Sequence, residues 1–493
     1  MKRRQFVLGT ALAGAAYLPF ARVWGTDVPR AGTDLAARNL SGGEITLARG
    51  DIADLARSLQ GELLLPDSPR YEQARRVWNG SIDKHPALIA ACVGAGDVMR
   101  AVNFAREHKL LTAVKAGGHS TSGKSTCEGG IMIDLAPMRG VRVDPATKTA
   151  YLEPGTLLGQ LDRECAAFGL ATTAGTVSNT GAAGLTLGGG FGRLCSRWGL
   201  ACDNLKGADV ISADGRLVHT SEAQNPELLW GLRGGGGNFG VVTSLEYSLH
   251  EMNPIVIGGM VTWPFKYARE VLDFYAQSAP SKPDMLCTDL LLRSAPDSDP
   301  AVSIVAVWSG DPAEGERALA PLRKLARTAQ GTIGPAPYVG LQSMFDGGFP
   351  DGRKYYQKSG LVSVLTKPLA ETLLDVFGTP RPYPLTMQLQ GMGGAASRVP
   401  PSATAFVHRD ALWDMAIVTR WDDGDSDAFI AGIRAVWARL EPFTKGFYVN
   451  SRYEDDLKAF RENYGDNYPR LVQLKKRYDP GNLFRLNANV VPT

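Results

Sequence analysis

The sequence predicts an α+β protein made of two unlike parts, and three observations carry this prediction. Helical and strand patterns mix along the chain up to about residue 250. From residue 253 to about 440, long strand-like runs dominate, which is typical of a mostly antiparallel sheet with accompanying helices. Glycine is dense in the first half, where several of the 56 glycines gather in clusters. With 493 residues, 44% of them apolar, the chain has material for two or three domains.

The first part begins with an amphipathic pattern at residues 97–110, which predicts a helix with Asp97 as its N-cap. Residues 110–120 read as a strand that runs into a loop, and residues 140–155 alternate on both sides of a turn, which predicts a hairpin. Residues 156–168 predict a second helix, with Thr156 as N-cap and Gly169 just past its end.

The second part contains the strand-like runs 255–265, 302–310 and 415–421 and a helical pattern at 313–329. Within residues 385–394, Thr386, Gln388 and Gln390 alternate with apolar residues. A strand with this alternation has one apolar face and one polar face, and the polar face could line a pocket.

Three glycine clusters lie at residues 116–120, 174–192 and 230–242. Gly235, Gly237 and Gly240 match the GxGxxG spacing, but a dinucleotide fingerprint needs a strand before it and a helix after it. Here a helical pattern precedes the glycines and a strand pattern follows them, so a nicotinamide-binding domain is disfavoured. The sequence also lacks a P-loop motif. Backbone amides without Cβ atoms can approach and bind a pyrophosphate, so converging glycine loops favour a large dinucleotide ligand such as FAD.

The chain resembles the berberine-bridge-enzyme-like FAD-linked oxidases, within the vanillyl-alcohol-oxidase and p-cresol-methylhydroxylase flavoprotein superfamily. The motifs that carry the resemblance are RVWNG at 76–80, KAGGHSTSG at 115–123, and the long segments 181–205, 228–245 and 464–490. The resemblance runs from about residue 45 to the end. It implies a two-subdomain FAD-binding fold of the p-cresol-methylhydroxylase type, joined to an antiparallel-sheet substrate domain with helices on one face. The implied domains are an FAD-binding domain at 26–252 with its core at 84–250, a substrate-binding domain at 253–440, and a segment at 441–493 that completes the FAD domain.

The same resemblance implies a covalent bond between His119 and the 8α methyl group of FAD. Some relatives add a second bond from a cysteine, and the corresponding position here is Val177, so a second link is not expected. The other residues expected to contact FAD are Ala116, Gly117, Gly118, Ser120, Gly175, Thr176, Gly181, Gly184, Gly189, Gly190, Gly192, Val242, Tyr448, Asn450, Asn487 and Asn489.

The implied reaction is hydride transfer from a substrate carbon to the flavin while a base removes a proton from the attached O–H or N–H, with O2 reduced to H2O2. A tyrosine follows the Y-x-N triplet in many plant relatives, but Ser451 follows Asn450 here. Serine is a poor base unless it is activated. Tyr453, Tyr448 or a residue of the middle sheet is therefore the expected base, and Gln388 and Gln390 are expected substrate contacts. Arg409 is interpreted as structural.

The N-terminal 25 residues are interpreted as a twin-arginine signal, because Arg3 and Arg4 precede an apolar stretch from Phe6 to Phe20 that is too short for a stable membrane anchor. The twin-arginine export machinery would then carry the folded protein to the periplasm or beyond. The net charge of +3 gives no basic face for nucleic acid. The six cysteines form no CxxC pair, so no metal site is expected, although one disulfide after export stays open.

The expected partners are thus a small-molecule substrate, an alcohol, sugar, amine or secondary metabolite, and O2. Two alternatives remain open at this stage. One is a flavin dehydrogenase that uses an acceptor other than oxygen. The other is a non-catalytic flavoprotein that sequesters a toxic metabolite.

Overall fold

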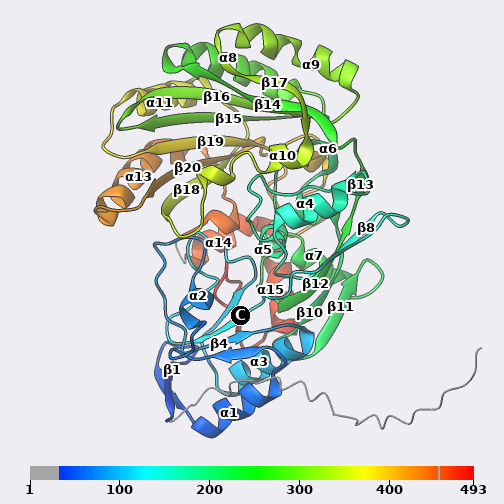
Figure 1. The fold of residues 1–493 in the computed structure, drawn as a ribbon, viewed down its shortest axis with the longest axis vertical. Coiled ribbons are helices and arrows are strands. Elements are labelled where there is room, and N and C mark those ends of the chain that lie inside the picture. Colours follow the sequence, from blue (N-terminus) through cyan, green and yellow to red (C-terminus); the bar gives the residue numbers. More distant parts are fainter. Residues whose placement is uncertain (1–32, 454–455) are drawn as a thin grey trace, which may run out of the picture.

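The computed structural model describes residues 33–453 and 456–493. The expected signal at 1–25 therefore lies outside the described residues. Three larger sheets organise the fold, which Figure 1 shows with the largest sheet in its upper part. Helices and antiparallel sheets occur together, which confirms the α+β class.

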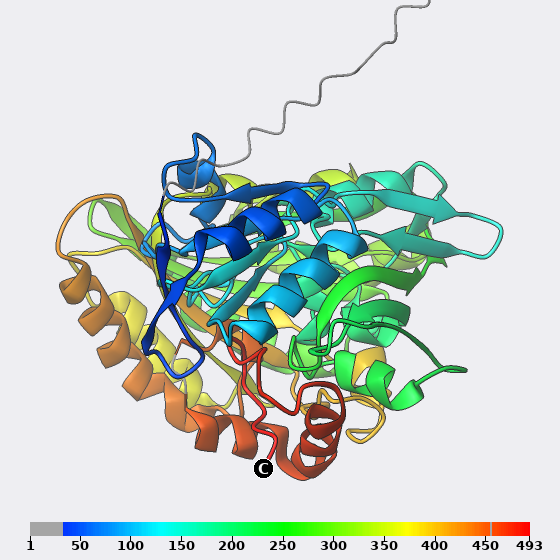
Figure 2. The ribbon, with the colours of Figure 1, turned by 90° about the horizontal axis from the view of Figure 1, so that it is seen from below.

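The first sheet has four strands in the order β3-β4-β6-β5, at Glu62–Leu64, Leu88–Ala91, Ile131–Asp134 and Thr112–Lys115. β4, β5 and β6 run parallel, and all four residues of β4 and of β6 are buried. Helices α1 (Arg49–Ser58) and α3 (Ala95–Glu107) pack on this sheet, and Figure 2 shows these blue helices from below. Asp97 lies inside α3 and does not cap it. Its buried carboxylate accepts hydrogen bonds from the backbone N–H groups of Gln60, Gly61 and Val93.

The second sheet has five antiparallel strands in the order β11-β10-β12-β8-β7, at Leu217–Ser221, Leu205–Ile211, Val241–Ser248, Thr149–Leu152 and Val141–Asp144. The hairpin expected at 140–155 is formed by β7 and β8. Helix α4 (Leu158–Ala166) begins two residues after Thr156, so Thr156 is not its N-cap. The hydroxyl of Thr156 donates to the carbonyl of Gly140 instead. Helix α7 (Pro226–Leu232) precedes the GxGxxG glycines and β12 follows them, which confirms that this motif is not a dinucleotide fingerprint.

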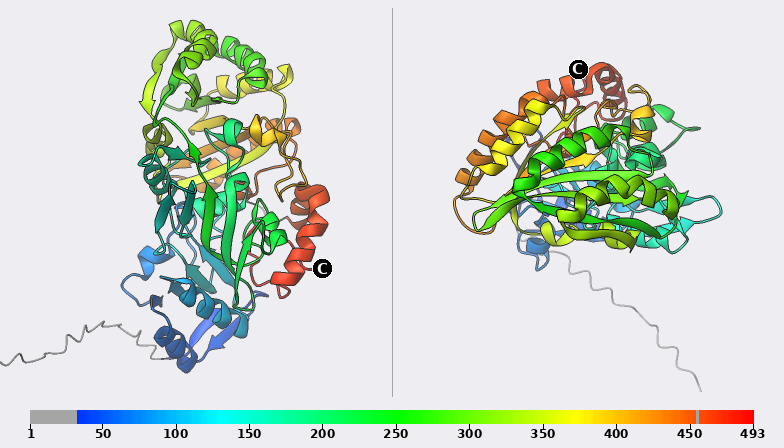
Figure 3. Two further views of the ribbon diagram at one scale, coloured as in Figure 1. Left: turned by 90° about the vertical axis from the view of Figure 1, so that its right-hand side faces the viewer. Right: turned by 90° about the horizontal axis from the view of Figure 1, so that it is seen from above.

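The third sheet has seven antiparallel strands in the order β17-β14-β16-β15-β19-β20-β18. Their bounds are Gln330–Pro337, Ile255–Pro264, Ser298–Trp308, Leu286–Ala295, Leu385–Gly391, Trp413–Trp421 and Lys354–Val362. Helices α8 (Ala268–Ser278), α9 (Pro312–Leu325), α11 (Lys367–Gly378) and α13 (Ser426–Leu440) pack on one face through a single apolar core. Figure 3, in its view from above, shows these green to orange helices over the sheet. The opposite face is turned toward the two smaller sheets.

The C-terminal segment returns to the two smaller sheets through α14 (Leu457–Tyr464) and α15 (Tyr468–Tyr478). The buried ammonium of Lys475, on α15, donates to Asp479 Oδ2 at 2.7 Å and to the carbonyls of Asn238 and Phe484, both at 2.9 Å. The side chain of Asn238 in turn donates to the carbonyl of Ala488 and accepts from the N–H of Val490. These contacts fix residues 484–490 beside the third glycine cluster.

The remaining short elements connect these layers. They are strands β1 (Leu35–Arg38), β2 (Glu44–Leu47), β9 (Leu170–Ala171) and β13 (His250–Glu251), and helices α2 (Tyr71–Arg75), α5 (Ala182–Leu187), α6 (Cys195–Trp198), α10 (Tyr338–Gln342) and α12 (Ala395–Arg398). No helix within the described ranges is long and apolar enough to cross a membrane. The six cysteines, all of them in the described part, are buried and form no disulfide.

Candidate functional site

A cavity of about 410 Å³ lies between the glycine loops and the uncovered face of the seven-stranded sheet. Its walls come from segments that are far apart in the sequence: residues 116–125, 175–187 and 236–242, the inward face of β18, β19 and β20, and residues 448–451 and 484–488. The volume is in the range of small-molecule and cofactor sites.

The glycine-rich wall depends on the absence of side chains. The loops that carry Gly117 and Gly181 approach so closely that a Cβ on Gly117 would lie 2.4 Å from the Cα of Gly181. Gly184 and Gly237 also line the cavity, and a Cβ on either would meet no protein atom within 4 Å. The first pair therefore brings two loops together, and the second pair leaves open space for a ligand.

Several buried polar atoms of this wall have no partner among the described residues. They are Oγ1 of Thr121, Oγ of Ser125 and Oδ1 of Asn487, and all three residues line the cavity. Unpaired buried polar atoms cost free energy unless a ligand or water satisfies them. The donor and acceptor set therefore fits a large polar ligand such as FAD.

His119 projects from the loop after β5 and lines the cavity. Trp78 stacks on its ring with the centroids 4.3 Å apart, and Tyr355 of β18 stacks on Trp78 at 4.0 Å. Nε2 of His119 lies 3.2 Å from Oδ1 of Asn179. Burial lowers the pKa of His119 to about 4, so the imidazole is neutral near pH 7 and keeps one nitrogen lone pair.

The sheet wall follows the strand alternation of the sequence. Leu385, Met387 and Leu389 are completely buried in the core, whereas Thr386, Gln388 and Gln390 line the cavity, which confirms the expected two-faced strand. The neighbouring strand β20 presents Asp414, Ala416 and Val418, because the register pairs these residues with Gln390, Gln388 and Thr386.

Asp414 is the acidic residue of this wall. Its side chain is buried, Oδ1 has no hydrogen-bond partner among the described residues, and burial raises its pKa to about 7. A carboxylic acid with this pKa exchanges its proton near neutral pH, which suits a general base.

Comparison with known proteins agrees with this geometry. Residues 86–221 match the family model for an FAD binding domain, and residues 447–491 match the model described as berberine and berberine like. An FAD-linked oxidoreductase of Dictyostelium discoideum is 31% identical over 445 residues, which cover 90% of this chain and 97% of that protein.

This chain belongs to the berberine-bridge-enzyme-like family of FAD-linked oxidases. It is therefore an FAD-dependent oxidoreductase. The crystal structure of 6-hydroxy-D-nicotine oxidase from Arthrobacter nicotinovorans matches with a TM-score of 0.82 at 30% identity, over 88% of this chain and 99% of that one. A chitooligosaccharide oxidase structure matches with a TM-score of 0.79 at 26% identity, over 90% and 100% of the two chains. These matches confirm the fold of the p-cresol-methylhydroxylase type.

In this FAD-linked oxidase, most residues expected at the site line the cavity. They are His119, Ala116, Gly117, Gly118, Ser120, Gly175, Thr176, Gly181, Gly184, Val242, Tyr448, Asn450, Asn487, Gln388 and Gln390. The hydroxyl of Tyr448 accepts from Asn450 Nδ2 at 2.8 Å and donates to the carbonyl of Leu185 at 3.2 Å. Burial also raises the pKa of Tyr448 well above its ordinary value. Tyr448 therefore holds helix α5 in place and is a poor proton acceptor.

Five expected residues do not line the cavity: Tyr453, Asn489, Gly189, Gly190 and Gly192. The hydroxyl of Tyr453 bonds to Asn79 Nδ2 and to the carbonyl of Tyr355, both at 3.1 Å, and its ring lies against Tyr356. The three glycines serve packing. A Cβ on Gly192, for example, would lie 1.8 Å from the carbonyl oxygen of Ala174.

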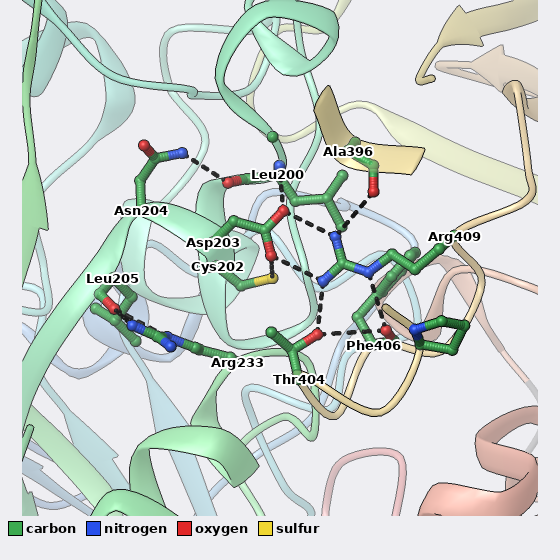
Figure 4. Close-up of polar contacts among 12 residues, drawn as sticks. Leu200, Cys202, Asp203, Asn204, Leu205, Arg233, Ala396, Thr404, Phe406 and Arg409 are labelled. Atoms are coloured by element: carbon green, nitrogen blue, oxygen red, sulfur yellow. Dashed lines mark hydrogen bonds and ion pairs between the residues drawn. The ribbon is translucent and has the colours of Figure 1, made fainter. Parts of the chain in front are cut away.

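Arg409 has the structural role that its sequence context indicates. Its guanidinium makes two 2.8 Å contacts with the carboxylate of Asp203 and donates to Thr404 and to the carbonyl of Phe406, as Figure 4 shows. This buried ion pair ties the loop before β20 to the 3₁₀ helix Ala201–Asn204.

Sequence reasoning missed Asp414, Trp78 and Asn179. A lone carboxylate at the start of the apolar run 413–421 was a signal for Asp414. Trp78 lies in the RVWNG motif, and nothing local in the sequence distinguishes Asn179.

Proposed function

We propose that this protein is an exported oxidase that holds FAD through a covalent bond to His119 and oxidises a small alcohol, sugar, amine or secondary metabolite, with O2 reduced to H2O2. The observation that carries the proposal is the juxtaposition of two walls in one cavity. One wall is the glycine-rich cradle with His119, and the other is a hydrogen-bonding sheet with the buried carboxylate of Asp414.

The neutral imidazole of His119 supports the covalent bond, because its unprotonated nitrogen can attack carbon. A single link is favoured by Val177, which lines the cavity at the position where some relatives have a cysteine, and by the absence of any cysteine from the cavity wall formed by the described residues. Bound FAD would supply a two-electron acceptor for the substrate hydride and would pass the electrons to O2.

The chain's own contribution is to bind and orient the substrate and to accept its proton. Gln357, Gln388 and Gln390 offer both donors and acceptors to hydroxyl or amino groups. Phe345 and Phe349 add apolar area beside them. The Oδ1 atom of Asp414 is the proposed acceptor of the substrate proton. It replaces Tyr453 and Tyr448 in that role because it is unpaired and titrates near pH 7.

The similar oxidases and the charges of the cavity wall indicate the class of substrate. The two oxidases to which the chain is similar are named for 6-hydroxy-D-nicotine and for chitooligosaccharides. Charged side chains at the described cavity wall, apart from His119, are limited to Lys124 and Asp414, one of each sign, so the wall favours a neutral substrate.

The test is a screen of alcohols, sugars, amines and aromatic metabolites for anaerobic bleaching of the flavin absorption, followed by admission of O2. The proposal predicts that a substrate bleaches the flavin and that O2 restores the colour with one H2O2 per turnover. Bleaching that only a quinone or dye reverses would favour a dehydrogenase. The covalent bond is tested separately: His119→Ala should release its flavin on acid denaturation, whereas the unmodified protein should stay yellow.

The export proposal rests on the sequence before residue 26. Replacing Arg3 and Arg4 with lysine should keep the flavin-loaded protein in the cytoplasm, as measured by cell fractionation. Periplasmic protein at the unmodified level in that variant would contradict export by the twin-arginine route.

A further inference from the structure

The neighbours of His119 form a continuous series of hydrogen bonds that leads out of the glycine-rich part of the fold. Oδ1 of Asn179 lies 3.2 Å from Nε2 of His119, and Nδ2 of the same amide donates to Oδ1 of Asp351 at 3.2 Å. One amide therefore faces the imidazole with its acceptor and a carboxylate with its donor. The carboxylate fixes which way the amide points, because its oxygens can only accept from Nδ2 at neutral pH.

A second acidic residue holds the backbone beside Asn179. Asp346 accepts from the N–H of Ser178 at 2.8 Å and from the hydroxyl of Ser178 at 2.5 Å. Charge-assisted hydrogen bonds of this kind are short and strong. Asp346 and Asp351 lie on the segment between α10 and β18, which leads into the seven-stranded sheet. Asp346 and Asp351, which precede β18, thus position the amide of Asn179 beside His119.

The Trp78 ring completes the arrangement. It stacks on the face of His119 and is itself covered by Tyr355 of β18. The indole N–H of Trp78 donates to the carbonyl of Phe349 at 3.0 Å, in the same connecting segment. His119 is therefore fixed through its ring face and through its Nε2 edge.

We propose that Asn179 is the positioning residue for the covalent attachment of flavin at His119, and that Asp346 and Asp351 hold Asn179 in the required orientation. The inference deepens the proposed function and rests on the covalent bond proposed there. By accepting from Nε2–H, the amide oxygen would keep the imidazole in the tautomer whose lone pair is on Nδ1, which is then the nitrogen that can bond to carbon.

Attachment would form a bond between Nδ1 of His119 and the 8α carbon and would break one C–H bond of that methyl group. One proton from the methyl group and the proton on Nε2 would leave to solvent. The two electrons of the broken C–H bond would pass to the flavin ring and then, with two protons from solvent, to O2, which is reduced to H2O2.

The arrangement also couples attachment to assembly. The acceptor at Nε2 is in place only when the segment that carries Asp346 and Asp351 is docked on the glycine loops. Covalent attachment should therefore follow docking of the seven-stranded sheet and its connecting segment on the glycine loops. A chain in which that sheet is displaced should hold flavin only reversibly.

The experiment measures the fraction of bound flavin that stays with the chain after acid denaturation, as a function of time after purification. Asn179→Leu keeps the size of the side chain and removes its donor and acceptor. We expect it to bind FAD but to attach it about 100-fold more slowly than the unmodified protein, the scale of a misplaced reacting group. Asp346→Asn and Asp351→Asn should slow attachment to a smaller extent.

A double exchange, Asn179→Asp with Asp351→Asn, keeps an acceptor for His119 at position 179 and reverses only the direction of the bond between 179 and 351. It should recover most of the attachment rate. Asp375→Asn is the matched control, since it neutralises an exposed carboxylate on α11 whose partner is Arg439. If Asn179→Leu fails to fold, the single aspartate variants and the double exchange still decide the question.

The outcomes test the positioning role of Asn179 and the covalent bond at His119 separately. Attachment at the unmodified rate in Asn179→Leu, or in both aspartate variants, would overturn the positioning role while leaving the covalent bond in place. Release of all flavin from the unmodified protein would overturn the covalent bond itself. Slow attachment in Asn179→Leu with FAD binding retained is the result that a merely structural role of Asn179 would not produce.

Discussion

Replacing Asp414 with asparagine should weaken catalysis and stabilise the fold at the same time. Burial raises the pKa of this carboxyl from 3.8 to about 7. The folded protein therefore holds the proton more tightly than the unfolded chain, and its stability falls as the pH rises between these two values. At about 1.4 kcal/mol per pKa unit, this difference in pKa lowers the free energy of unfolding by about 4 kcal/mol at pH 8, about 2 kcal/mol at pH 5 and less than about 1 kcal/mol at pH 4.

Asp414→Asn removes this titration. The difference in unfolding free energy between the variant and the unmodified protein should grow by about 3 to 4 kcal/mol, in favour of the variant, from pH 4 to pH 8. Denaturant unfolding followed by tryptophan fluorescence at several pH values measures it. The same variant should lose about 10²- to 10⁴-fold in kcat/KM, and the rise of the rate with pH near 7 should disappear. A stability difference that does not change with pH, together with an unaltered pH–rate profile, would refute the assignment.

Gly184 at the cavity wall and the buried pair of Arg409 with Asp203 can be tested in the same way. Gly184→Val should fold but bind less FAD, because the valine side chain would enter the open space of the cavity. Gly340→Val, at an equally open helical glycine away from the cavity, is the control and should keep full flavin content. Equal flavin content in the two purified variants would contradict the role of Gly184 in the cavity wall. Arg409→Ala should destabilise the protein by about 3 to 5 kcal/mol, since it leaves the carboxylate of Asp203 buried without its partner. Arg398→Ala, which breaks an exposed pair with Asp284, should leave the denaturation midpoint nearly unchanged, and similar midpoints for the two arginine variants would argue against the buried pair.

The parts of the site that local pattern specifies could be predicted from the sequence. The alternation at Thr386, Gln388 and Gln390 depends only on the two-residue period of a strand, and the structure follows it. The order of helix, glycines and strand around Gly235–Gly240 likewise disfavours a dinucleotide fingerprint, and the structure has this order.

The parts that depend on tertiary register could not be predicted. Asp414 faces the cavity because β20 pairs with β19 in one particular register, and a shift of one residue would turn it into the core. Tyr453 was expected at the site from its place after Asn450, but the 3₁₀ turn at Val449–Ser451 directs the chain away, and the ring packs beside Tyr356.

The glycine clusters show a further limit of local reasoning. Gly184 opens onto the cavity, whereas Gly190, only six residues later, is needed because a Cβ there would lie 2.4 Å from the side chain of Leu185. Composition reveals that glycines are required, but it cannot separate those that face a ligand from those that let two protein segments touch.

Peptide mapping of the purified protein tests the covalent bond between His119 and FAD. Trypsin cleavage after Lys115 and Lys124 releases a nine-residue peptide, 116–124, that contains His119 as its sole histidine. If the bond is present, this peptide absorbs visible light, carries the added mass of one FAD, and fragments with the flavin on the histidine. The same peptide recovered unmodified from yellow, active protein would contradict it.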